Sequence, residues 1–120
     1  MAAPPSPADP DARARAILHE VGLPEGLLPP GITKAELEAG GAFTVELPQR
    51  VERVHGGYTV RFGPRISGQL SPGKVRGLRG VEAKQLIWLG VEAIAVEGEA
   101  LVFSVGPARV RLPRAAFPWG

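Results

Sequence analysis

Cysteine is absent from the 120-residue sequence, and no long apolar run occurs in it. Without cysteine, disulfide bonds, thiolate zinc sites and a cysteine nucleophile are all excluded. No window approaches the ~18 consecutive apolar residues that indicate a membrane-spanning helix. The segment from Met1 to Asp11 lacks the basic and apolar regions of a signal peptide. We therefore expect a cytoplasmic protein, or a segment cut from a longer precursor.

Side chains that hold metals or perform acid–base catalysis are scarce. The only histidines are His19 and His55, and the only aspartates are Asp9 and Asp11. Two distant histidines without cysteine give no metal-ligand cluster. No glycine-rich loop follows a predicted strand and opens a helix, so nothing indicates a nucleotide site. The sequence thus predicts a protein without a metal or another cofactor.

Length and charge indicate one domain with a solvated basic surface. At 120 residues we expect a disordered leader over 1–9 and a single β-rich domain over 10–118. The net charge of +2 divides into −4 over residues 1–49 and +6 over residues 50–120. The basic residues occur singly and often alternate with apolar ones, as on the outer face of a sheet. A nucleic-acid footprint clusters its charge, so we expect no nucleic-acid partner.

The beginning of the domain predicts one helix and a rigid loop. Asp9 suits an N-cap, and Gly22 suits the end of a helix. Apolar residues at helical spacing between them predict an amphipathic helix over 10–21. Residues 22–32 place prolines and glycines around Leu27-Leu28, which indicates an extended apolar loop.

After residue 32 the apolar period shifts towards two, with frequent turn residues. This spacing is typical of antiparallel barrels and sandwiches. The segments that we expect as strands are 33–37, 43–47, 51–54, 58–62, 65–70, 74–78, 81–89, 91–96, 101–105 and 108–112. The predicted fold class is mainly β, with about nine or ten short antiparallel strands and one N-terminal amphipathic helix.

Apolar phrases punctuated by glycine and proline run along the chain. They are Leu23-Pro24-Glu25-Gly26-Leu27-Leu28-Pro29, Gly57-Tyr58-Thr59-Val60-Arg61-Phe62, Ile66-Ser67-Gly68, Gly80-Val81 with Lys84, Trp88-Leu89, and Phe103-Ser104-Val105-Gly106. In this order they resemble the plant domain-of-unknown-function family number 538, over about residues 12–118. The resemblance implies a β-rich pseudo-barrel similar to the lipid-binding bactericidal/permeability-increasing fold. It also implies a link to plant stress responses and a proposed esterase activity on chlorophyll.

The first functional hypothesis is ligand binding. A barrel or pseudo-barrel of this size can hold one small ligand if its inward side chains leave space. The candidates for the wall or mouth, which otherwise form plain core, are Leu27, Leu28, Tyr58, Phe62, Trp88 and Phe103. We therefore expect a hydrophobic or amphipathic small molecule, such as a lipid or pigment, as the ligand.

Two alternatives stay open. A weak hydrolase of pigment or lipid esters needs a nucleophile and a base, and no serine lies in a G-x-S-x-G elbow. That leaves Ser67 or Ser104 with His55 as the candidate pair. A protein-interaction module would instead use the Leu27-Leu28 loop or an exposed strand edge, with an unknown protein partner.

Overall fold

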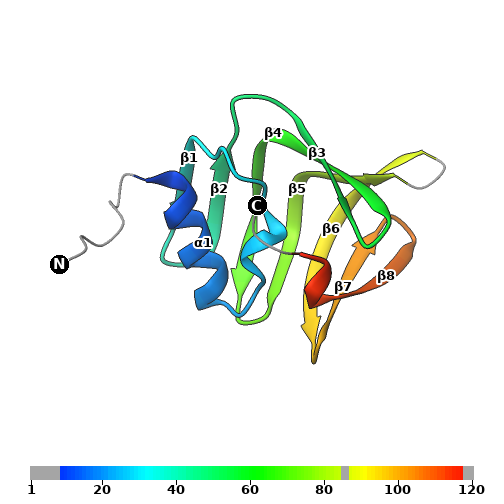
Figure 1. Cartoon of the computed structure of the whole chain (residues 1–120). Coiled ribbons are helices and arrows are strands. Elements are labelled where there is room, and N and C mark those ends of the chain that lie inside the picture. The colour runs from blue at the N-terminus through cyan, green and yellow to red at the C-terminus, as the bar shows by residue number, and fades with distance from the viewer. Residues whose placement is uncertain (1–8, 85–86, 118–120) are drawn as a thin grey trace.

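The computed structural model describes residues 9–84 and 87–117, which form a bent antiparallel sheet with helical segments on one face (Figure 1). The strands are β1 (Lys34–Leu37), β2 (Ala42–Glu46), β3 (Val51–His55), β4 (Tyr58–Ser71), β5 (Lys74–Lys84), β6 (Trp88–Glu97), β7 (Ala100–Val105) and β8 (Ala108–Pro113). The helical segments are α1 (Pro10–Glu20) and the short 3-10 helices η1 (Glu25–Leu27) and η2 (Arg114–Ala116). The leader expected over residues 1–9 lies, apart from Asp9, outside the described residues.

The predicted N-terminal helix is confirmed, with the expected start signal. The Asp9 carboxylate accepts hydrogen bonds from the backbone N–H groups of Asp11 and Ala12, so it satisfies two donors that a helix start leaves open. The helix ends before Gly22, whose φ of +82° suits glycine. Only Ala14 and Leu18 of α1 are fully buried, so one narrow side of the helix faces the sheet.

The fold is mainly β and its sheet is antiparallel, as predicted. Its hydrogen-bonded order is β1-β2-β4-β5-β6-β7-β8, with β3 pairing with β4 beside this path. Residues 65–69 of β4 pair with β2, whereas residues 58–62 pair with β3. Because β4 bends between these two halves, its second half lies beside β2 while its first half carries the β3–β4 hairpin.

Within residues 9–84 and 87–117 the strands number eight rather than nine or ten, because predicted breaks at glycine and proline are irregularities within long strands. β4 runs through Gly63-Pro64, with an irregular register opposite β5 between Phe62 and Ser67. Gly80 lies in β5 with a φ of +88°, and a Cβ there would collide with the carbonyl oxygen of Arg65. Glycine thus permits the backbones of two long paired strands to approach closely at a position where a break between strands was predicted.

The single strand predicted over 81–89 is also wrong. Residues 81–84 end β5 and Trp88 begins β6, with Lys84 paired opposite Trp88 in a hairpin. Leu86, within this predicted strand, lies outside the described residues. No glycine or proline between Lys84 and Trp88 signals that one strand ends and the next begins.

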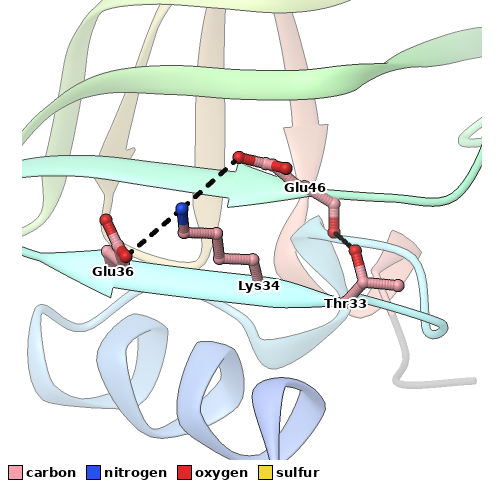
Figure 2. A network of polar contacts seen from close by, with 4 residues as sticks. All are labelled: Thr33, Lys34, Glu36 and Glu46. Atoms are coloured by element: carbon pink, nitrogen blue, oxygen red, sulfur yellow. Dashed lines mark hydrogen bonds and ion pairs between the residues drawn. The ribbon is translucent and has the colours of Figure 1, made fainter.

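The sheet is not closed into a barrel, because no pairing joins β1 to β8 in the described part of the chain. Figure 2 shows the edge at β1, where Lys34 Nζ lies 3.5 Å from Glu36 Oε1 and 3.9 Å from Glu46 Oε2. The Thr33 hydroxyl donates to the backbone carbonyl of Glu46. Such charged, exposed side chains discourage further strand pairing at an edge.

Candidate ligand-binding cavity

A cavity of about 70 Å³ lies between the sheet and the segments packed on it. We define the inner face as the side of the sheet that carries the buried side chains of β2, β4, β5 and β7. We define the cover as α1, η1 with Leu28, and the C-terminal segment 114–117. Ala14, Ile17 and Leu28 line the cavity from the cover, and so does Phe117.

The wall of the cavity is almost wholly apolar. Every described residue that lines it is apolar except Glu36, Tyr58 and His55. Glu36 lies at the rim, with its side chain 61% exposed and paired with Lys34. Tyr58 is half-buried at the start of β4, and His55 is buried at the end of β3. The cavity therefore offers one deeply buried polar side chain among hydrocarbon surfaces.

Five of the six predicted ligand-binding residues line this cavity. They are Leu27 and Leu28 from the cover, Tyr58 and Phe62 from β4, and Phe103 from β7. Leu27 is buried and Leu28 is half-buried, so the loop that contains them packs against the sheet. The leucine pair is therefore part of the core that surrounds the cavity, and Leu27 is not offered to a partner.

Trp88, the sixth predicted residue, does not line the cavity. It lies opposite Lys84 on the outer face, with the Arg61 guanidinium carbon 4.0 Å from its ring centroid. The Lys84 ammonium lies 5.9 Å from the same centroid. Arg61 also donates to Glu82 at 2.8 Å, so the indole belongs to a surface cation–π and ion-pair cluster.

His55 was missed as a cavity residue, although strand alternation could have found it. Val51, Arg53 and His55 share one face of β3, and His55 is only 4% exposed. Its Nδ1 lies 2.9 Å from the carbonyl oxygen of Ala116 in the cover. Its ring stacks on Phe117, with centroids 4.5 Å apart, so the end of β3 is joined to the C-terminal segment.

Phe117 extends this stack to the far side of the cavity. Its ring centroid lies 5.3 Å from that of Phe103 in β7, at an interplanar angle of 25°. The stacked rings of His55, Phe117 and Phe103 thus connect β3, the cover and β7. Such aromatic contacts add about 0.5–1.5 kcal/mol each beyond the burial of their area.

The surroundings of His55 favour its neutral form. Burial lowers the pKa of His55 from its ordinary value of 6.5, because the imidazolium loses hydration. The hydrogen bond to Ala116 opposes this shift, whereas the positive charge of Arg53 adds to it. The net lowering means that the ring is neutral at pH 7.

The candidate hydrolase residues are not brought together. Ser67 pairs opposite Thr44, next to the inward Ile66, and so lies on the outer face. Ser104 likewise alternates with Phe103 and Val105, which are buried on the inner face. Both hydroxyls are thus separated from His55 by the sheet.

Two further site types have no basis within residues 9–84 and 87–117. No three histidine, aspartate or glutamate side chains gather there in a way that could hold a metal ion. No helix in these ranges has the length and apolar character needed to span a bilayer.

Fold and cavity together define a small β-rich domain that encloses an apolar cavity under a helical cover. The family described as "Protein of unknown function, DUF538" matches residues 14–118, and the chain belongs to this family, as the sequence motifs predicted. The chain is also similar to "Uncharacterized protein At5g01610" of Arabidopsis thaliana, with 29% identity over 97 residues. This match covers 79% of the chain and 57% of the relative, so the chain spans little more than half of the relative's length.

Proposed function

We propose that the protein binds a hydrophobic or amphipathic small molecule, such as a lipid or pigment, in the cavity under the cover. The observation that carries this proposal is the cavity itself, whose apolar wall is formed by residues from the sheet and the cover. Leu27, Leu28, Tyr58, Phe62 and Phe103 are the proposed contact residues. A concave, mostly apolar site with few polar groups is typical of small-molecule binding.

The size of the cavity limits what it holds without rearrangement. Its volume of about 70 Å³ is well below the ~300 Å³ of a site for a drug-sized ligand. A larger ligand therefore enters only as the cover moves outwards. Displacement of α1 exposes Leu18 and the core surface beneath it and breaks the hydrogen bonds from the backbone N–H groups of Gly31 and Ile32 to the Asp11 carboxylate, so it costs more than the ~1.5–3 kcal/mol of one large side chain. Each methylene of a bound alkyl chain offsets about 0.8 kcal/mol of that cost.

A titration with small apolar probes tests the proposal. Toluene and the 1-alkanols from butanol to octanol are added to the 15N-labelled protein, and amide shifts are followed to saturation. The shifts should concentrate on the lining strands, and the affinity should rise about fourfold per methylene until the accessible space is filled. Absence of saturable shifts with every probe would contradict the proposal.

Two of the predicted site residues provide a matched pair of variants. Leu28→Ala truncates a half-buried wall residue, enlarges the small cavity and should strengthen toluene binding. Trp88→Ala removes an aromatic residue that is absent from the wall and should leave toluene binding unchanged. Equal effects of the two substitutions would show that the probe binds elsewhere.

A further inference from the structure

The hydrogen bond between His55 and Ala116 fixes the roles of the two imidazole nitrogens. The Ala116 carbonyl oxygen only accepts hydrogen bonds, so His55 Nδ1, at 2.9 Å, must be the donor. In a neutral imidazole whose Nδ1 carries the proton, Nε2 has a free lone pair and accepts. Burial and the charge of Arg53 lower the pKa of His55 and keep the ring in this neutral form at pH 7.

This acceptor is unusual for its surroundings. Nε2 makes no hydrogen bond to any residue in the described part of the chain, and although His55 as a whole is only 4% exposed, this atom is not fully shielded. The side chain lines a cavity whose other deep walls are hydrocarbon and aromatic surfaces. An acceptor that is accessible but has no protein partner can accept a hydrogen bond from a ligand, and few polar groups compete for that ligand in an apolar site.

From this geometry we infer that His55 Nε2 recognises the hydroxyl group of an amphipathic ligand whose apolar part occupies the cavity. The inference rests on the proposed function and specifies the ligand class, namely an uncharged alcohol or phenol. The ligand O–H donates to Nε2, while its hydrocarbon part contacts Phe117 and the inner face of the sheet. No covalent step is involved.

The same geometry discriminates among polar head groups. A carboxylate, phosphate or sulfate presents only acceptors, which face the lone pair of Nε2 unfavourably. A ketone or ester also lacks a donor, so it leaves the histidine acceptor without a partner. Of the other polar side chains in the wall, Glu36 lies at the exposed rim and Tyr58 is half-buried. Tyr58 is therefore the residue that must be tested against His55.

Phenol and toluene form a suitable probe pair, since a hydroxyl group in one replaces a methyl group of similar size in the other. The measured quantity is the ratio of phenol to toluene affinity in the wild-type protein and in variants. His55→Asn retains an amide donor at the position of Nδ1, for the Ala116 carbonyl, and removes Nε2. His55→Phe retains a ring that stacks on Phe117 and removes both nitrogens. Tyr58→Phe removes the other hydroxyl-binding group from the wall.

Both His55 variants should lower the phenol-to-toluene ratio by roughly tenfold, while Tyr58→Phe leaves it unchanged. Retention of toluene binding in each variant shows that the cavity persists, so a lost preference cannot be attributed to unfolding. An unchanged ratio in both folded His55 variants would overturn the inference and leave the apolar site intact. Loss of the preference only in Tyr58→Phe would also overturn it. If neither probe binds the wild-type protein, the proposed function itself is wrong.

Discussion

Filling the cavity from the sheet should stabilise the protein and weaken ligand binding at the same time. Ala83 lies in β5, is 5% exposed and lines the cavity, with Val60 and Leu89 opposite it on the neighbouring strands. Ala83→Val adds two methyl groups there without a polar atom. Valine also suits a strand better than alanine does.

Two estimates agree on how much Ala83→Val raises the free energy of unfolding. A cavity of about 70 Å³, at about 24 cal/mol per Å³, lowers stability by about 1.7 kcal/mol. Burial of two methyl groups at about 0.8 kcal/mol each contributes about 1.6 kcal/mol. We therefore expect the free energy of unfolding to rise by as much as ~1.6 kcal/mol, because the added groups nearly fill the space.

Urea denaturation and toluene titration of the same variant provide the assay. Ala95→Val is the matched control, since Ala95 lies in β6, is half-buried and does not line the cavity. Ala83→Val should weaken toluene binding, whereas Ala95→Val should not. Unchanged toluene affinity in a stabilised Ala83→Val protein would refute the location of the site. A destabilisation of ~1–3 kcal/mol would indicate overpacking and would contradict the claim that the cavity leaves room for two methyl groups beside Ala83.

Two further predictions concern β5 and His55. Gly80→Ala should lower stability by at least ~2 kcal/mol more than Gly77→Ala, because both glycines have positive φ but only a Cβ at position 80 meets the Arg65 backbone. Equal urea midpoints for the two variants would contradict this. The pKa of His55 is lowered in the folded state, so the unfolded chain binds its proton first as the pH falls through 6.5. The contribution of neutral His55 to the free energy of unfolding is therefore fully present above pH 6.5. As the pH falls below 6.5, this contribution decreases by at most ~1.4 kcal/mol per pH unit until the lowered pKa of the folded state is reached. The charged and titratable neighbours of His55 are Arg53 and Tyr58. His55→Phe should abolish this part of the pH dependence in urea denaturation, and parallel curves for the two proteins would count against it.

The elements that the sequence predicts well are those with local signals at both ends. Asp9 and Gly22 bound the helix, and the hairpin glycines Gly56 and Gly57 separate β3 from β4 as expected. Gly63 and Gly80 are also glycines, but they lie inside long strands and permit a close approach of the paired backbones of β4 and β5. A single sequence does not distinguish these uses, because the deciding contact joins residues far apart in the chain.

In the candidate site, too, residues with local sequence signals were predicted, whereas those that depend on distant contacts were not. The inward positions of Phe62 and Phe103 follow from alternation, and both line the cavity. Trp88 adjoins Leu89 in a run that is apolar on both faces, so alternation alone leaves its face undetermined. Its outward position depends on the hairpin register that pairs it with Lys84. The contact between His55 and Ala116 spans 61 positions and has no local sequence signal.

The bend of β4 explains how one histidine can serve both the cover and a ligand. Because residues 58–62 of β4 pair with β3 rather than β2, the end of β3 reaches the C-terminal segment. That segment is in turn joined to the loop after α1, since Arg114 Nη1 donates to the carbonyl oxygen of Gly22. Nδ1 of His55 therefore holds the cover while Nε2 remains available to the cavity. A ligand hydroxyl that binds Nε2 increases the polarity of the same ring and strengthens its donation to Ala116, so ligand binding and closure of the cover support each other.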